Sequence, residues 1–289
     1  MTAFEKIRAY YYLTKPGIVR GNLVWLTGGF LLASRGQLNF VTFLGVFVGT
    51  GVVIASACVV NNYLDRSIDE KMERTRKRAL VVGSINVRSA LVFAATLGII
   101  GFALLIFYTN LLTTTIGIIA YIFYVVIYGI AKRASYHGTL VGTIPGALPP
   151  VAGYVAVTGR IDFGAILIFL ILVFWQMPHF YAIAIYRRKE YKNAGIPVVS
   201  VAKGLTFTKR AIMWYILAFM VSVICLFIAG YTGLTYLVAM LVIGTAWFVL
   251  GLRGFRVANT DAWARRMFRF SLLVTLIFSI MISVDNLLI

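Results

Sequence analysis

Long stretches of apolar residues recur along the whole chain, separated by shorter polar segments. Nine of them approach the roughly 20 residues that a helix needs to cross a hydrocarbon layer about 30 Å thick. They are 17–34, 40–63, 89–108, 111–131, 138–157, 163–185, 211–230, 233–252 and 268–287. The runs are apolar on every face, unlike the alternating strands of a membrane β-barrel. The pattern therefore predicts an all-α protein, a polytopic membrane bundle of nine transmembrane helices.

Composition supports this class. Of the 289 residues, 61% are hydrophobic and only 12% are charged, whereas an average soluble domain carries about 25% charged residues. We expect residues 1–289 to form a single membrane domain without a removable targeting peptide. Cys58 and Cys225 both lie in apolar stretches, and we expect neither a disulfide nor a metal site from them.

Basic residues outnumber acidic ones, with 27 Lys and Arg against 9 Asp and Glu. Nine spans place 25 of the 27 on one side and leave Arg35 and Arg160 on the other. Because cytoplasmic loops are enriched in Lys and Arg, this predicts a cell inner (cytoplasmic) membrane protein with its N-terminus cytoplasmic and its C-terminus outside. The basic residues indicate topology and contact with the lipid bilayer, with no nucleic acid as partner.

Two long loops, about 64–88 and 186–210, fall on the cytoplasmic side and carry most of the unusual residues. Long loops in a compact bundle are usually functional or disordered. A weak repeat with an offset of 117 residues relates Glu73 to Glu190 and Val81-Val82 to Val198-Val199. The repeat indicates that the two loops face each other across one site, which would face the cytoplasm.

The first loop begins with a cluster of acidic residues. Four of the nine acidic residues, Asp65, Asp69, Glu70 and Glu73, lie within nine positions. Asn61, Asp65 and Asp69 are spaced four apart, so a helix continuing from the second span would align them on one face. Two carboxylates and an amide oxygen suit Mg²⁺, which recruits phosphate oxygens as further ligands. The alternative is a solvated surface of self-paired charges.

Basic residues follow this cluster directly. Arg74 and Arg78 are again four apart, and guanidinium groups bind phosphate bidentately. Acidic residues that bind a metal, followed by basic residues that bind phosphate, predict a diphosphate substrate at the cytoplasmic membrane face.

A second cluster closes the sixth span, with Trp175-Gln-Met-Pro-His179-Phe-Tyr181 followed by Tyr186-Arg-Arg-Lys-Glu190. We expect Pro178 to kink the helix and the Pro145–Pro150 stretch to break the fifth span. His179 is a candidate axial ligand, proton carrier or hydrogen-bond donor; an ordinary interfacial histidine is the alternative. The aromatic residues could equally form a membrane-interface belt.

The row Asn61-x3-Asp65-x3-Asp69-x2-Met72-x-Arg74-Thr75-x2-Arg78 resembles the first acidic motif of the UbiA-type intramembrane prenyltransferases. The chain is most similar to the haem-farnesylating branch of that family, the protohaem IX farnesyltransferases or haem O synthases. This resemblance runs nearly end to end. It includes Thr14-Lys15-Pro16-Gly17-Ile18, the stretch from Gly142 to Tyr154, Trp175-Gln-Met-Pro-His179 and Gly195-Ile-Pro197.

The resemblance implies transfer of a farnesyl group from farnesyl diphosphate to the 2-vinyl group of haem b, with Mg²⁺ as cofactor. It implies that Asn61, Asp65 and Asp69 hold the metal, and that His179 and Lys189 complete the catalytic set. The substrate-binding residues would be Arg74, Arg78, Tyr181, Tyr186, Arg187, Arg188 and Glu190. Haem-handling proteins or haem A synthase would be its protein partners.

The segment from Tyr186 to Glu190 departs from the family's quinone-type members, which carry a second Asp-x3-Asp pair there. A second metal site is therefore in doubt, and Lys189 with the neighbouring arginines would hold diphosphate or the haem propionates directly. Three other interpretations stay open: a prenyltransferase for aromatic or quinone-precursor acceptors, a small-solute transporter, and a haem-binding protein without catalysis. A transporter would place ionisable residues at mid-membrane, and a haem carrier would leave the acidic row unexplained.

Overall fold

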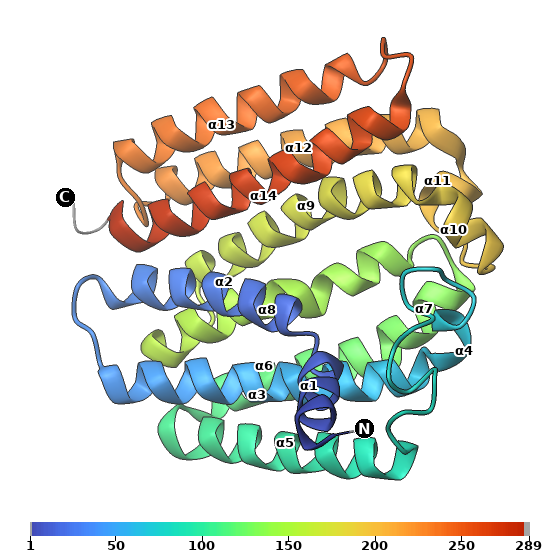
Figure 1. Cartoon of the computed structure of the whole chain (residues 1–289). Coiled ribbons are helices and arrows are strands. Elements are labelled where there is room, and N and C mark those ends of the chain that lie inside the picture. Colours follow the sequence, from blue (N-terminus) through green and yellow to red (C-terminus); the bar gives the residue numbers. More distant parts are fainter. Residues whose placement is uncertain (1, 286–289) are drawn as a thin grey trace.

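The structure is a computed structural model that describes residues 2–285, a range in which every regular element is a helix. The long elements are α2 (Pro16–Ser34), α3 (Phe40–Leu64), α5 (Val87–Tyr108), α6 (Leu111–Ile122) with the π-helix η1 (Phe123–Ile127) and α7 (Tyr128–Ala134), α8 (Gly138–Thr158), α9 (Phe163–Tyr186), α12 (Gly204–Ile228), α13 (Leu234–Arg253) and α14 (Thr260–Val284). They run side by side as one bundle (Figure 1). The short helices are α1 (Ala3–Leu13), α4 (Arg66–Asp69), α10 (Arg188–Asn193) and α11 (Val199–Ala202).

Eight helices among the described residues are long and apolar enough to cross a membrane, with α6, η1 and α7 counting as one. The predicted all-α, multi-pass membrane fold is therefore confirmed. The first expected span, 17–34, coincides with α2, but α2 is not one of the eight. Arg20 and Asn22 lie in its first half and reduce its apolar character. The count of nine spans and the orientation of the termini stay predictions.

Two helices begin well before the apolar runs that predicted them. α12 begins at Gly204 rather than at 211, and α14 begins at Thr260 rather than at 268. Backbone hydrogen bonding continues a helix past the hydrocarbon layer, where long basic side chains can extend to the interface. The first turns of α14 thus carry arginines in a helical arrangement. Positions 286–287, at the end of the last expected span, lie outside the described residues.

The expectation that prolines break the fifth span is wrong. α8 is continuous from Gly138 to Thr158 although Pro145, Pro149 and Pro150 lie inside it, and α9 likewise continues through Pro178. Each proline removes one N–H donor, and neighbouring helices in a buried bundle can supply other hydrogen bonds. Separately, the side chain of Gln176 ties α9 to α8 by donating from Nε2 to the Thr143 carbonyl at 3.1 Å.

Close contact between α2 and α8 holds the two halves of the bundle together. A Cβ added at Gly29 would overlap the Pro150 carbonyl, and one added at Gly153 would overlap the Leu26 carbonyl. Small residues allow helix backbones to approach in a membrane, where packing rather than the hydrophobic effect drives association. The two glycines therefore set the α2–α8 separation, and with it the position of the residues that precede α2.

We expect Gly29→Ala to destabilise the folded protein by at least about 2 kcal/mol, because the added methyl group overlaps a backbone oxygen that cannot rotate away. Gly21→Ala in the same helix is the matched control, since nothing lies within 4 Å of its added Cβ. Thermal unfolding midpoints of the two variants in detergent, compared with the wild type, test this. Equal midpoints for both variants would contradict the close α2–α8 contact.

Candidate active site

The end of α3 and the short helix α4 place the acidic row at one end of the bundle, where α7, α10 and α11 also lie (Figure 1). α3 ends at Leu64, so the predicted uninterrupted helix through Asp69 does not form. Asp65 caps α3, and α4 ends at Asp69. The backbone nevertheless keeps the four-residue repeat, because Asp65 N donates to Asn61 O at 2.9 Å and Asp69 N to Asp65 O at 2.8 Å.

Asp65 is buried, with 7% of its surface exposed, and it pairs with cations from α7. The Lys132 Nζ lies 2.5 Å from Asp65 Oδ2, and the Arg133 Nη2 lies 3.5 Å from Oδ1. Arg133 also donates to the Leu64 carbonyl at the end of α3. A buried carboxylate requires such partners, because desolvation alone would disfavour its charge. These contacts join α3 to α7 at the site.

Asp69 is also buried, and its partner comes from its own loop. Arg78 Nη1 lies 2.5 Å from Asp69 Oδ2, so the arginine predicted to bind phosphate is here paired with the acidic row itself. The loop is folded back further by Thr75, whose hydroxyl donates to the Asp69 carbonyl at 3.0 Å. Arg74, by contrast, is exposed.

Asn61 is held by Lys15, which precedes α2. Lys15 Nζ donates to Asn61 Oδ1 at 2.6 Å, and the buried Asn61 amide nitrogen has no hydrogen-bond partner among residues 2–285. Lys15 has a left-handed backbone, with φ of 50°, in a position before Pro16 that disfavours the α-helical region. Burial lowers the pKa of Lys15 to about 8, and the charges of Arg78 and Lys132 act in the same direction.

Each of the three oxygen-bearing side chains of the row is therefore covered by a cation. Two carboxylates face four cations, Lys15, Arg78, Lys132 and Arg133, so the site carries net positive charge. No group of three or more His, Cys, Asp or Glu that could hold a metal occurs among residues 2–285. Two carboxylates and one amide oxygen suit Mg²⁺ when phosphate oxygens complete its shell. The residues thus fit a metal ion that arrives with an anionic phosphate ligand.

An aromatic wall adjoins this site, with Tyr124 in the π-helix η1 and Tyr128 at the start of α7. The rings of Tyr124 and Tyr128 stack with centroids 5.9 Å apart, and Lys132 Nζ lies 5.0 Å from the Tyr128 centroid. The Tyr124 hydroxyl lies 3.9 Å from Cys58 Sγ. Short π-helical turns are frequent at functional sites. Sequence reasoning missed these tyrosines. It counted Lys132 only as a topology signal, and it quoted Lys15 within the Thr14–Ile18 stretch of the family resemblance without assigning it a role.

The two long loops meet at Glu190, as the internal repeat predicted. The Arg74 backbone N–H donates to Glu190 Oε1 at 3.4 Å, and Arg187 Nη1 lies 2.9 Å from Glu190 Oε2. Tyr186 stands beside them and contacts both Arg187 and Arg265, with guanidinium carbons 5.5 and 5.1 Å from its ring centroid. Glu190 therefore connects the second cluster to the loop of the acidic row.

The other residues of the second cluster spread in different directions. His179 packs against α14, where its Nδ1 lies 2.8 Å from Ser271 Oγ. Tyr181 packs against Tyr215 of α12, with ring centroids 6.0 Å apart. Lys189 is exposed and makes no side-chain hydrogen bond or ion pair within residues 2–285. None of the three contacts the acidic row directly.

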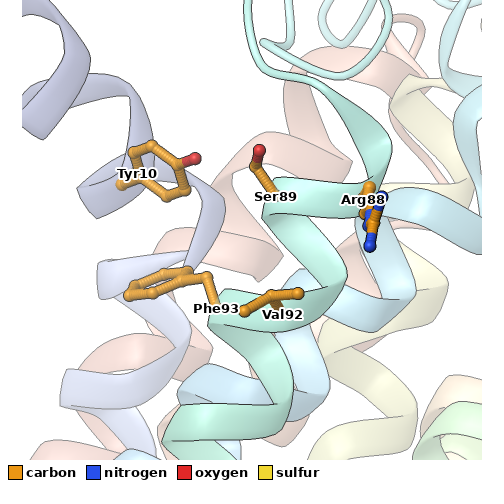
Figure 2. Close-up of a pocket in the computed structure, with 5 residues that line it drawn as sticks. All are labelled: Tyr10, Arg88, Ser89, Val92 and Phe93. Atoms are coloured by element: carbon orange, nitrogen blue, oxygen red, sulfur yellow. The ribbon is translucent and has the colours of Figure 1, made fainter.

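Two open hollows lie at the edge of the bundle. The larger, about 560 Å³, lies between α1 and α5 and is lined by Tyr10, Arg88, Ser89, Val92 and Phe93 (Figure 2). None of the predicted site residues lines it. The second, about 390 Å³, is lined by Arg188, Leu205 and the residues from Ala258 to Asp261. Of these two hollows, the second is bordered by a predicted substrate-binding residue, Arg188.

Residues 22–273 match the UbiA prenyltransferase family. The chain is 47% identical over 280 residues to a protein named protoheme IX farnesyltransferase from Yersinia pseudotuberculosis serotype O:1b (strain IP 31758), covering 96% of this chain and 95% of that protein. A protein of the same name from Citrobacter koseri (strain ATCC BAA-895) is 48% identical over 279 residues, covering 96% of this chain and 94% of its own length.

Solved structures show the same fold at low identity. A UbiA homologue from Aeropyrum pernix K1 has a TM-score of 0.77 at 20% identity, covering 93% of this chain and 98% of its own. A UbiA homologue from Archaeoglobus fulgidus, bound to GPP and Mg²⁺, has a TM-score of 0.65 at 14% identity. The match covers 95% of this chain and 99% of that one. A digeranylgeranylglyceryl phosphate synthase structure has a TM-score of 0.82 at 18% identity, and the match covers 99% of this chain and 100% of that one.

Proposed function

Because the chain belongs to the UbiA prenyltransferase family, it is a multi-pass membrane prenyltransferase, and we propose that it farnesylates protohaem IX. The reaction would move a farnesyl group from farnesyl diphosphate to the 2-vinyl group of haem b and release diphosphate, giving haem O. The observation that carries the proposal is the buried row Asn61, Asp65 and Asp69, surrounded by cations at one end of the bundle. The haem acceptor is supported by relatives of that name that match nearly the whole chain.

The row would hold the metal and the leaving group together. Asp65, Asp69 and Asn61 are the proposed Mg²⁺ ligands, in keeping with the Mg²⁺ bound by the Archaeoglobus fulgidus homologue. When bound, Mg²⁺ would neutralise charge on the diphosphate and make it a better leaving group. Since cations now cover all three side chains, substrate binding would redirect Lys15, Lys132 and Arg78 from the protein oxygens to the phosphate oxygens.

The basic residues would act at two distances. Lys15, Lys132 and Arg78 lie within the site and stabilise negative charge as it develops on the departing diphosphate. Arg74 and Lys189 are exposed at the loops and attract the anionic substrate as it approaches. Positive charge concentrated around a largely buried position is what a diphosphate leaving group needs.

The carbon–oxygen bond of farnesyl diphosphate breaks with its electron pair leaving on diphosphate. The dry bundle interior and the faces of Tyr124 and Tyr128 would shield and stabilise the allylic cation. Electrons of the haem vinyl group form the new carbon–carbon bond, and water then adds as the hydroxyl and loses a proton. His179 would orient the haem or handle that proton. Tyr181, Tyr186, Arg187, Arg188 and Glu190 would complete the acceptor side.

We further propose that residues 1–289 form one domain in the cytoplasmic membrane, with nine spans and the active site facing the cytoplasm. The concentration of 25 of the 27 basic residues in alternate connecting segments supports this orientation, because such loops remain cytoplasmic. Haem-handling proteins or haem A synthase are the protein partners that such a product implies.

The proposal is tested by incubating membranes that contain the protein with haem b and farnesyl diphosphate. A haem product heavier by one farnesyl group and one hydroxyl group, absent from membranes carrying Asp65→Asn, is the expected result. Prenylation of an aromatic acid without any haem product would instead show a quinone-precursor enzyme. Haem retention with neither product would show a haem-binding protein.

The low pKa of Lys15 predicts that the rate of farnesyl transfer depends on pH. As pH rises through about 8, the ammonium group loses its proton, and with it the positive charge beside Asn61. We expect kcat/KM for farnesyl diphosphate, which reports the free enzyme, to fall about tenfold per pH unit above that value. Lys15→Arg should remove this decline, because arginine stays charged.

Steady-state kinetics between pH 6 and about 9.5 in detergent measure the effect. Lys6→Arg is the matched control, since Lys6 is exposed on α1 and its replacement should leave the decline in place. If the decline persisted in Lys15→Arg, a different group would be responsible.

A further inference from the structure

The hydrogen bonds around His179 determine which of its ring nitrogens carries the proton. Ser271 Oγ donates its single proton to the Phe268 carbonyl at 2.6 Å. The same oxygen lies 2.8 Å from His179 Nδ1, so it must accept a proton from Nδ1–H. A neutral imidazole protonated at Nδ1 has its lone pair on Nε2. Because the Ser271 hydroxyl donates to the Phe268 carbonyl, Nε2 of His179 is left as an electron-pair donor.

The lone pair on Nε2 has no hydrogen-bond partner among residues 2–285. The ring itself is held firmly, stacked on Trp175 with centroids 5.0 Å apart and lying 4.8 Å from the Phe268 ring. Trp175 is fixed in turn, because its Nε1 donates to the Ser271 carbonyl at 2.8 Å. Metal-binding histidines have this arrangement, with one nitrogen hydrogen-bonded to a neighbour and the other free for the metal.

Basic residues lie on the cytoplasmic side of this histidine. The Phe268 and Tyr186 rings pack edge to face with centroids 6.1 Å apart, and the guanidinium groups of Arg187 and Arg265 both lie over the Tyr186 ring. Arg187 is paired with Glu190. Arg265 is exposed and has no carboxylate partner in the described part of the chain. At least one guanidinium group at this position is thus free to bind an anion.

Helix geometry gives the spacing between the imidazole of His179 and the arginines around Tyr186. Ser271 and Arg265 are six residues apart on α14, about 9 Å along the axis, and His179 and Tyr186 are seven apart on α9, about 10 Å. Protohaem has its iron at the centre of the ring and both propionates at one edge. A spacing of this size suits an iron ligand at one end and propionate-binding groups at the other.

We propose that His179 Nε2 binds the iron of the acceptor haem, that Ser271 positions the imidazole, and that Arg265 with Arg187 binds the propionates. The inference rests on haem being the acceptor in the proposed function. It assigns an orientation: the propionates face the cytoplasmic end, and the opposite, vinyl-bearing edge points into the bundle. Arg265 and Ser271 thereby become specificity and positioning residues for the acceptor.

Haem b binding to the purified protein in nanodiscs, without farnesyl diphosphate, tests the iron ligand. The wild type is expected to show the Soret band and electron paramagnetic resonance signals of nitrogen-ligated ferric haem. His179→Gly should lose them, and added imidazole should restore them. Metal-free protoporphyrin should bind both proteins equally. Wild-type spectra in His179→Gly would overturn the assignment.

The positioning role of Ser271 has its own readout. Ser271→Ala should still bind haem but shift the electron paramagnetic resonance g-values, because the Nδ1 hydrogen bond that sets the ring orientation and basicity is lost. Ser271→Thr, which keeps the hydroxyl, should restore the wild-type values. Unchanged g-values in Ser271→Ala would remove Ser271 from the proposal.

Propionate binding is tested with haem b and its dimethyl ester. Arg265→Ala should weaken haem b binding by at least about tenfold, the effect of one charge-assisted hydrogen bond, and leave the ester unaffected. Arg266→Ala is the matched control, an exposed arginine at the next position of α14. Equal losses for haem and ester, or equal effects of the two variants, would overturn the propionate assignment.

These binding measurements are separable from the proposed function. Haem ligation by His179 without any farnesylated product would disprove the transferase proposal for haem and leave the haem site standing. Farnesylated haem together with unchanged spectra in His179→Gly would support the transferase proposal and disprove His179 as the iron ligand.

Discussion

Asp65→Asn and Asp69→Asn are each expected to reduce farnesyl transfer on the order of a thousandfold or more, while the protein still inserts into the membrane. Both carboxylates are buried and would be charged ligands of the metal, which an amide replaces poorly. Each change also leaves a cation without its counter-charge, Lys132 in the first case and Arg78 in the second. Product formation is measured by mass spectrometry at equal amounts of membrane-inserted protein.

Glu70→Gln is the matched control for these variants. It removes a carboxylate from the same loop, but Glu70 is exposed and pairs with no cation among the described residues. Activity near the wild-type level is expected, and thermal unfolding midpoints in detergent identify any variant that fails only because it unfolds. Full activity of a folded Asp65→Asn or Asp69→Asn protein would disprove the metal assignment.

Removal of divalent metal should have an effect of similar size. Turnover in excess chelator is expected to fall on the order of a thousandfold and to recover when Mg²⁺ is added back. The net positive charge of the site adds a second expectation: Mg²⁺ should bind poorly to the protein alone and well together with a diphosphate. Local repulsion from Lys15, Lys132, Arg133 and Arg78 is then offset by the anionic ligand.

Metal binding can be followed with Mn²⁺ as a paramagnetic probe, with and without an unreactive farnesyl diphosphate analogue. Undiminished turnover in excess chelator would contradict the role of the metal. Equally tight Mn²⁺ binding with and without the analogue would contradict the charge argument but leave the ligands in place.

Much of the site follows from spacing along the chain. The four-residue repeat of Asn61, Asp65 and Asp69 survives in the structure, although α3 ends before Asp65. Arg78 is close enough in sequence to fold back onto Asp69. The internal repeat correctly indicated that the loops meet, which they do at Glu190. Local geometry suffices for the row and for the Arg78–Asp69 pair, because few residues separate the partners, whereas the Arg74–Glu190 contact spans 116 residues and only the repeat pointed to it.

Other features depend on how the helices pack. The cations on Asn61 and Asp65 come from Lys15 and Lys132, far away in sequence, and their position follows from the α2–α8 contact and from α7. The continuity of α8 through Pro145, Pro149 and Pro150 was likewise not predictable from residue type, because proline disfavours a helix interior and a buried bundle can override that preference.

The sequence by itself determined the all-α membrane class, the positions of nearly all the long helices and the acidic row, because hydrophobicity and four-residue spacing are local properties. Only the tertiary structure decided that cations from distant parts of the chain cover Asn61 and Asp65, that Tyr124 of η1 stacks on Tyr128 of α7, and that Ser271 leaves the His179 Nε2 lone pair free. These contacts join residues on different helices. Their partners are selected by the packing of whole helix surfaces, which no short stretch of sequence specifies.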